Sequence, residues 1–227
     1  MSMKPYYERD GIVIYHGDAR EVLPTLDVGG VDLVLTDPPY GVRQNTDNRR
    51  FTKGPRSHIA NGGDGIGSAN GLPVTGDTEP FDPSFLLQYG QYQVIWGWNN
   101  FPNLLPRGAT LVWLKRNDAA FQSFLSDAEL AWMSKGHGVY CRRDLSNNAI
   151  ARQRTHPTQK PVSLMTWCLS FFPKAQTILD PFMGSGSTLV AAHQSGRRAI
   201  GIEIEERYAE IAATRLQQAV LPLQEAA

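Results

Sequence analysis

Short apolar runs, each followed by a turn or a polar stretch, recur along this chain and predict the strands of an α/β fold. Runs with the length and composition of strands lie at 11–15, 31–35, 93–98, 109–114, 175–180 and 199–202, and the runs 121–125 and 128–133 continue a β-rich middle. Apolar residues recur with helical spacing at 19–26, 83–89, 162–172, 189–195 and 205–220. Alternating strands and helices are typical of an α/β domain.

Two stretches, 42–76 and 134–154, lack this apolar periodicity and are read as loops inserted into a single domain that spans 1–227. Both are basic: 43–58 holds five cationic side chains and one acidic one, and 136–154 holds four cationic side chains and one acidic one. Such segments are typical of phosphate contacts, although solvated surface loops remain the alternative. The candidate DNA-binding residues are Arg43, Arg49, Arg50, Lys53, Arg56, Arg142, Arg143, Arg152 and Arg154.

Composition adds mainly exclusions. The formal net charge is +0, so a nucleic-acid partner has to be held by local patches rather than by a global field. Cys141 and Cys168 have no metal-type or redox spacing, and the chemistry below needs no metal. The amino terminus lacks a signal peptide, and the most apolar segment, 162–172, is too short to span a bilayer. We therefore expect a cytoplasmic protein without membrane contact.

The stretch Thr36-Asp37-Pro38-Pro39-Tyr40-Gly41 directly follows the apolar run 31–35. Asp37 thus stands at the carboxyl end of a predicted strand, where open α/β sheets bind ligands. The prolines stiffen the backbone and leave carbonyl groups free beside the carboxylate, while Tyr40 offers a flat ring. An acceptor pair beside a stacking platform suits a planar group that carries an amino group, with a simple turn after the strand as the alternative. The candidate catalytic residues are Asp37, Pro38, Pro39 and Tyr40.

A second candidate site begins at the end of the run 175–180. The chain continues as Asp180-Pro181-Phe182-Met183-Gly184-Ser185-Gly186-Ser187-Thr188, and a helix and a strand ending at Glu203 follow. Glycines let the turn approach a ligand closely, a helix amino terminus supplies free N–H groups, and a later acidic residue is the usual partner of ribose hydroxyls. The turn lacks GxGxxG spacing and a Walker lysine, and Asp180 would repel phosphate but attract an amino or sulfonium cation. The pattern favours S-adenosylmethionine.

These motifs resemble those of the amino-methylating DNA methyltransferases, which act on adenine N6 or cytosine N4. Asp37-Pro38-Pro39-Tyr40 matches the catalytic motif of that family, and Asp180 to Gly186 matches its cofactor motif. The catalytic motif comes first, as in the permuted β group, and His156-Pro157-Thr158-Gln159-Lys160-Pro161 resembles a further cofactor-side motif. The resemblance implies a Rossmann-like methyltransferase domain with a seven-stranded mixed sheet and helices on both faces. A homodimer is also in keeping with it.

The resemblance further implies a role for each matched residue. Asp18 would lie near the cofactor adenine, Glu203 on the ribose, and Thr158 and Lys160 over the methionine end. The candidate cofactor-binding residues are Asp18, Asp37, Thr158, Lys160, Asp180, Pro181, Phe182, Gly184, Ser185, Gly186, Ser187, Thr188 and Glu203.

The predicted function is transfer of a methyl group from S-adenosylmethionine to a base flipped out of double-stranded DNA. Adenine N6 is favoured because an acidic first position in the catalytic motif is more common among adenine enzymes, with cytosine N4 as the alternative. Two readings of other classes stay open: a nicotinamide-dependent oxidoreductase built on the glycine turn, and a nucleic-acid-binding module without catalysis.

Overall fold

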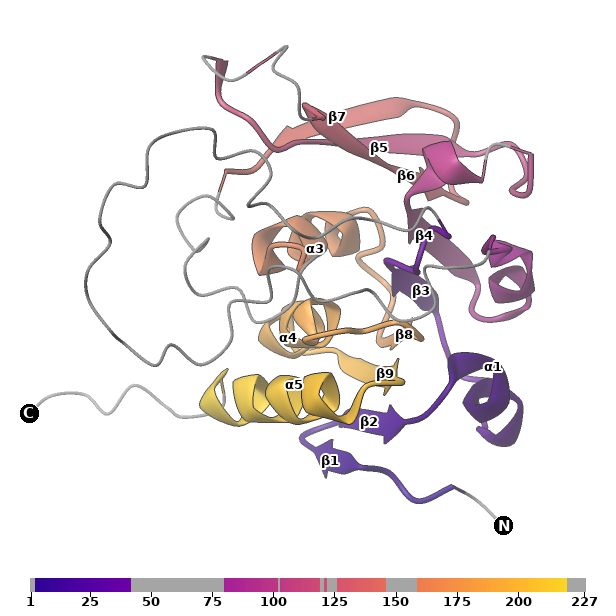
Figure 1. Ribbon diagram of the computed structural model, residues 1–227, viewed down its shortest axis with the longest axis vertical. Helices are drawn as coiled ribbons and strands as arrows, with labels where there is room; N and C mark the ends of the chain where they lie inside the picture. Colours follow the sequence, from indigo (N-terminus) through magenta and orange to yellow (C-terminus); the bar gives the residue numbers. More distant parts are fainter. Residues whose placement is uncertain are drawn as a thin grey trace, which may run out of the picture.

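All the strands of the computed structural model belong to one sheet with helices on both of its faces (Figure 1). The structure describes residues 3–41, 80–101, 103–118, 121, 126–145 and 159–219. The strands are β1 (Tyr7–Arg9), β2 (Ile12–His16), β3 (Leu33–Thr36), β4 (Tyr92–Trp96), β5 (Ala109–Leu114), β6 (Ala128–Met133), β7 (Val139–Arg143), β8 (Thr177–Asp180) and β9 (Arg198–Glu203). The helices are α1 (Ala19–Val22), α3 (Val162–Ser170), α4 (Ser187–Gln194) and α5 (Glu206–Ala219), with short 3-10 turns η1 (Leu23–Thr25), η3 (Pro83–Gln88) and η4 (Trp98–Asn100).

The strand order is β1-β2-β9-β8-β3-β4-β6-β5-β7. Strands β2, β9, β8, β3 and β4 are parallel to one another, so their carboxyl ends share one edge of the sheet. Strand β6 is antiparallel to both β4 and β5, and β7 is parallel to β5. The sheet is therefore mixed, as predicted. Two strands from the C-terminal part of the chain, β9 and β8, lie between the N-terminal strands β2 and β3.

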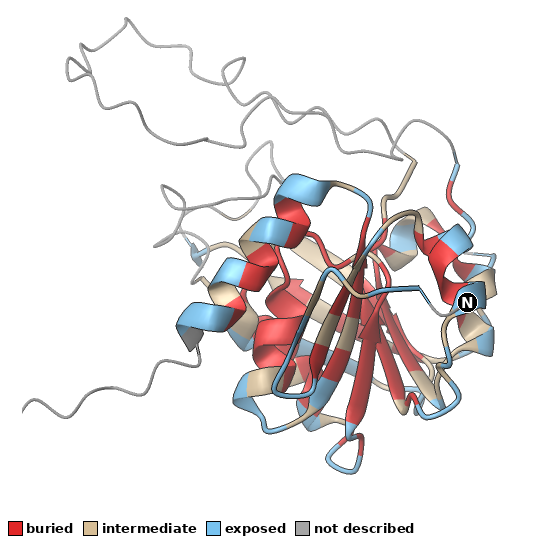
Figure 2. Ribbon diagram, turned by 90° about the horizontal axis from the view of Figure 1, so that it is seen from below, coloured by how far each residue is buried: buried red, intermediate tan, exposed pale blue. Residues whose placement is uncertain are grey.

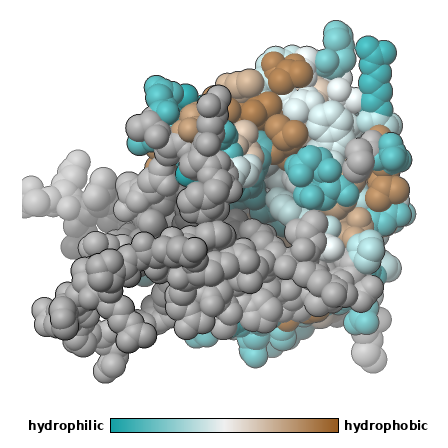
Figure 3. Space-filling model, turned by 45° about the horizontal axis from the view of Figure 1, so that its top comes forward, coloured by the Kyte–Doolittle hydropathy of each residue, from teal (hydrophilic) through white to brown (hydrophobic). Residues whose placement is uncertain are grey.

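The prediction of seven strands was wrong, since the described residues form nine. Strand β1 was not predicted at all, and β7 lies within 134–154, which was read as a loop. Both are edge strands with little buried surface: Val139 is 67% exposed and Tyr140 42%. Edge strands are held by backbone hydrogen bonds to a single neighbour, so they need no apolar periodicity. The part of the surface shown in Figure 3 accordingly intersperses hydrophobic and hydrophilic side chains.

The core lies on both sides of the central strands, where burial is greatest (Figure 2). Strand β3 (LVLT) and strand β8 (TILD) are buried along their whole length, as expected of parallel strands covered on both faces. Helices α3, α4 and α5 cover one face, and α1 with the 3-10 turns covers the other (Figure 1). No helix in the described ranges is long and apolar enough to cross a membrane.

Candidate functional site

Four carboxylates stand along one edge of the sheet, each at or just beyond the carboxyl end of a parallel strand. Asp18 follows β2, Glu203 ends β9, Asp180 ends β8 and Asp37 follows β3. The strand order places them in that sequence along the edge. The predicted residues thus lie at the edge where open α/β sheets bind ligands.

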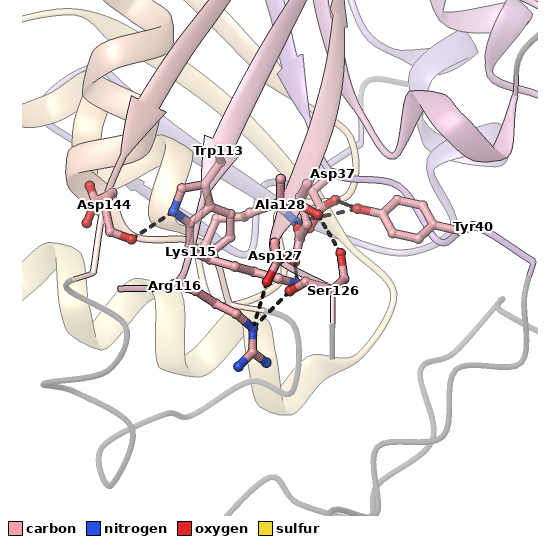
Figure 4. A network of polar contacts seen from close by, with 11 residues as sticks. Asp37, Tyr40, Trp113, Lys115, Arg116, Ser126, Asp127, Ala128 and Asp144 are labelled. Atoms are coloured by element: carbon pink, nitrogen blue, oxygen red, sulfur yellow. Dashed lines mark hydrogen bonds and ion pairs between the residues drawn. The ribbon is translucent and has the colours of Figure 1, made fainter. Parts of the chain in front are cut away.

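Asp37 is held by two donors, one at each carboxylate oxygen, and Figure 4 shows the one from Tyr40. The Tyr40 hydroxyl donates to Oδ1 at 2.5 Å, and the Lys160 ammonium donates to Oδ2 at 2.5 Å. The ring of Tyr40 packs edge-on against Phe101, with ring centroids 6.0 Å apart. The stiff Pro38-Pro39 segment thus brings the carboxylate and the ring together, as the sequence predicts, and adds a direct hydrogen bond between them.

Lys160 also contacts a second carboxylate, which sequence reasoning missed. Its Nζ lies 3.0 Å from Oε2 of Glu129, whose Oε1 accepts a hydrogen bond from Lys115 at 2.8 Å. Glu129 is the second residue of β6, and Lys115 immediately follows β5. The one available signal was a lone carboxylate in the otherwise apolar run Ala128–Met133.

Burial and neighbouring opposite charges together determine the pKa values of Asp37, Lys160 and Glu129. Burial lowers the pKa of Lys160, but Asp37 and Glu129 outweigh this and raise it well above its ordinary value. Burial alone would raise the pKa of Glu129, yet Lys160 and Lys115 bring it down to about 2. Burial raises the pKa of Asp37 despite the ammonium beside it. The lysine therefore stays charged as long as a carboxylate faces it.

The predicted cofactor turn between β8 and α4 is tied to carboxylates from two strands. Asp180 Oδ1 accepts hydrogen bonds from the Thr36 hydroxyl at 2.7 Å and from the Phe182 amide at 3.2 Å. Glu203 Oε2 accepts from the Gly184 amide at 2.9 Å. Gly184 and Gly186 both adopt positive φ, as the predicted tight turn requires. Burial raises the pKa of Asp180 to about 6 and that of Glu203 to about 7.

Helix α5 also contacts the turn between β8 and α4 through Arg215. Arg215 donates from Nη1 to the carbonyl oxygen of Ser185 and, at 3.2 Å, to its hydroxyl. The arginine lies within the predicted final helix, but its contact depends on how that helix packs, which no local pattern reveals.

One pocket joins the candidate catalytic residue to the cofactor turn. Its walls are formed by Asp37, Gln159, Lys160, Met165, Asp180, Phe182, Met183, Gly184, Ser185, Ser187 and Thr188. Two carboxylates, one ammonium, several hydroxyl groups and one apolar wall line it. The carboxylates outnumber the ammonium, so the pocket suits an uncharged sugar and a cationic sulfonium better than a phosphate. The donor set therefore fits S-adenosylmethionine. The described residues contain no group of His, Cys, Asp and Glu side chains that could hold a metal ion.

Asp18 is used locally, because its Oδ1 accepts a hydrogen bond from the Arg20 amide at 2.8 Å and so caps α1. A separate hollow of about 380 Å³ opens between α1 and η3, lined in part by Arg20 and Phe85. It does not include the carboxylates of the pocket. The contact of Asp18 with a cofactor adenine stays a prediction.

Only two candidate DNA-binding residues lie within the described ranges, and both sit on β7. Arg143 Nη2 pairs with Asp118 Oδ1 at 2.7 Å, and Arg142 Nε lies 3.7 Å from Asp144 Oδ2. Their contact with DNA stays a prediction. The remaining candidates fall outside the described residues: Arg43, Arg49, Arg50, Lys53, Arg56, Arg152, Arg154 and the cofactor candidate Thr158.

Comparisons with known proteins point the same way. A family model for DNA methylase (N6_N4_Mtase) matches residues 132–214. The putative methylase YubD of Escherichia coli (strain K12) is 30% identical over 233 residues, covering 93% of this chain and 92% of YubD. The crystal structure of the M1.HpyAVI–SAM complex has a TM-score of 0.57 at 21% identity and covers 90% of this chain and 98% of its own. For the cytosine-N4-specific PvuII DNA methyltransferase the TM-score is 0.61 at 15% identity, with 97% and 90% covered.

The likeness to YubD extends over nearly the whole of both chains, and the solved structures share the fold. The pocket at the strand ends holds the predicted acceptor and the predicted cofactor turn side by side. The M1.HpyAVI structure was solved in complex with S-adenosylmethionine, the cofactor predicted for this chain. The chain belongs to the amino-methylating, N6-adenine or N4-cytosine, DNA methyltransferase family.

Proposed function

We propose that this protein transfers a methyl group from S-adenosylmethionine to the exocyclic N6 of adenine in double-stranded DNA. The observation that carries the proposal is the position of Asp37, whose carboxylate lines the same pocket as the cofactor turn. The preference for adenine rests on the acidic residue at the first position of the catalytic motif. Cytosine N4 is the second candidate, supported by the shared fold with the cytosine-N4-specific PvuII enzyme.

The target nitrogen is a poor nucleophile, because its lone pair is delocalised into the base. Asp37 and the Pro38 carbonyl each accept a hydrogen bond from the amino group, which draws the nitrogen toward a tetrahedral shape and directs its lone pair toward the methyl donor. Bound S-adenosylmethionine would supply the electrophilic methyl group and leave as S-adenosylhomocysteine, and the methylated nitrogen then loses one proton. The chain thus contributes positioning and preorganised acceptors, and Asp37 needs no covalent bond to the base.

The base is inaccessible inside a duplex, so it has to leave the stack before Asp37 can reach it. Tyr40 provides an aromatic ring beside the acceptor, and the hydrogen bond from its hydroxyl fixes that ring relative to the carboxylate. The basic side chains of 42–76 and 134–154 are proposed to hold the phosphates around the flipped base. A homodimer stays a prediction.

Incubation with methyl-labelled S-adenosylmethionine and unmethylated genomic DNA tests the proposal. We expect label in N6-methyladenine after digestion to nucleosides, measured by mass spectrometry. Label in N4-methylcytosine alone would replace adenine by the second candidate. If the protein binds S-adenosylmethionine and DNA but transfers no label, it is a nucleic-acid-binding module without catalysis, and the proposal fails.

The affinity for S-adenosylmethionine is expected to fall as the pH is lowered from 8 to 5.5. The raised pKa values of Asp180, about 6, and Glu203, about 7, mean that both carboxylates become neutral over this range. Asp180 then attracts a cation less, and Glu203 accepts hydrogen bonds from the ribose less strongly. We expect binding to weaken about tenfold, which corresponds to ~1.4 kcal/mol. Titration calorimetry at the two pH values measures the change.

Stability of the ligand-free chain should move in the opposite direction. Both carboxyl groups have folded-state pKa values above their ordinary values of 3.8 and 4.5. Their contribution to the free energy of unfolding is therefore fully present below about pH 4 and is lost as the pH rises through 6 and 7. Urea unfolding in the same buffers supplies this control, and affinity and stability that fall together on acidification would contradict the assignment.

A further inference from the structure

Four side chains of alternating charge form a continuous chain that begins at the pocket, and its two ends, Asp37 and Lys115, are labelled in Figure 4. Asp37 contacts Lys160 at 2.5 Å, Lys160 contacts Glu129 at 3.0 Å, and Glu129 contacts Lys115 at 2.8 Å. They come from the ends of β3, β6 and β5 and from the residue before Pro161 at the start of α3. The family motifs explain Asp37 and Lys160, but neither Glu129 nor Lys115 has a role in the mechanism above.

The Lys160 ammonium is shared between two carboxylates. Its side chain is only 4% exposed, and its Nζ lies 5.6 Å from the centroid of the Trp96 ring. Besides Asp37 and Glu129, it reaches the Tyr40 hydroxyl at 3.4 Å. A buried ammonium requires a facing carboxylate, so Lys160 can release one of the two only if the other holds it.

Two hydrogen-bond donors compete for the carboxylate of Asp37. Its Oδ2 accepts from Lys160 here, whereas the proposed reaction needs Asp37 to accept from the amino group of the base. Asp37 and Lys160 both line the pocket that fits the cofactor, so an ammonium held at Asp37 also repels a sulfonium cation. Glu129, 30% exposed and anchored from its far side by Lys115, is positioned to hold the ammonium instead.

We infer that Glu129 is a positioning residue that takes up the Lys160 ammonium when Asp37 receives the target amino group and the sulfonium of S-adenosylmethionine lies in the pocket. Glu129 touches neither substrate nor cofactor in this role and acts through Lys160. The inference rests on the proposed role of Asp37, but its test is a binding equilibrium that needs no DNA.

The test compares S-adenosylmethionine with S-adenosylhomocysteine, whose sulfur is neutral. In Glu129→Gln the ammonium has only Asp37 as a charged partner and stays beside the sulfur. We expect S-adenosylmethionine to bind about tenfold more weakly, while the affinity for S-adenosylhomocysteine changes by less than about twofold. Asp127→Asn is the matched control, because it removes one negative charge two residues away from Glu129, and Asp127 lies near Arg116 rather than Lys160. Its ratio of the two affinities should equal that of the wild type.

A double variant separates release of the lysine from a simple loss of charge. In the Lys160→Met background, Glu129→Gln should leave the ratio of the two affinities unchanged, because no ammonium remains to be moved. An equal tenfold shift in that background would mean a field effect and would overturn the inference. Parallel weakening of both ligands in Glu129→Gln would indicate a purely structural role and would overturn it as well.

A substitute variant covers the case in which Glu129→Gln does not fold, and a methylation assay separates failure of this inference from failure of the proposed function. If Glu129→Gln does not fold, Lys115→Met serves in its place: it frees Glu129 to hold Lys160 more strongly, and the preference for S-adenosylmethionine should rise, with a fall contradicting the inference. If both ligands bind as expected in every variant but no DNA is methylated, the proposed function fails and the role of Glu129 stands.

Discussion

Asp37→Ala is expected to abolish methyl transfer, with a loss of at least about a thousandfold in turnover, because it removes an acceptor aimed at the reacting amino group. Binding of S-adenosylmethionine should change by less than about tenfold, since most of the pocket wall and the turn after β8 stay in place and Glu129 still faces Lys160. Single-turnover transfer of labelled methyl to DNA, combined with calorimetry of the cofactor, measures both quantities.

Asp27→Ala is the control for this substitution. Asp27 is an exposed aspartate in the turn before β3, outside the pocket, and its Oδ1 accepts a hydrogen bond from the Gly29 amide at 3.3 Å. It should retain transfer within about twofold of the wild type, as surface substitutions usually do. Turnover of Asp37→Ala close to that of the control would remove Asp37 from the mechanism.

Gly97→Ala is expected to lower both stability and turnover. Gly97 adopts φ +83° at the end of β4, and a Cβ there would lie 2.1 Å from Cε1 of Tyr40. The tyrosine ring would have to leave its place beside Asp37, or the end of the strand would have to shift. We expect a loss of about 2–4 kcal/mol in the free energy of unfolding, as for overpacked buried positions with backbone strain, and transfer at least about a hundredfold slower through loss of positioning.

Gly196→Ala isolates the clash from the backbone strain. Gly196 has a similar φ of +68°, but an added Cβ would meet nothing within 4 Å. It should cost only about 1 kcal/mol, the usual penalty for a left-handed non-glycine residue. Urea unfolding and methyl transfer are measured on both variants, and equal effects would show that contact between Gly97 and Tyr40 is unimportant.

The sequence predicted the elements that depend on local pattern. β5 and β6 have the predicted bounds, and the other central strands agree within a few residues. β1 and β7 could not be found from periodicity because edge strands bury little. A turn signal for β1 was nevertheless present, since Asp10-Gly11 with positive φ at both residues is a preferred two-residue hairpin loop.

In the candidate site, too, the residues marked by a local pattern were predicted, and those that depend on the folded sheet were missed. Asp37, Asp180 and Glu203 were identified because each follows an apolar run and stands at its carboxyl end. Glu129 and Lys115 were missed because their role depends on β6 and β5 lying beyond β4 in the sheet. The contact between Lys160 and Asp37 spans 123 positions of the chain, and only the folded sheet brings the two together.

The interleaved strand order also determines when activity can arise during synthesis. β2 pairs with β9, and the hydrogen bond between Thr36 and Asp180 joins residues 144 positions apart. A nascent chain that ends before β8 and β9 leaves β2 and β3 without the neighbours between them, and pairing of such distant segments is slow. We therefore expect the pocket to form only after β8 and β9 have left the ribosome, and translation products that lack these strands to be inactive.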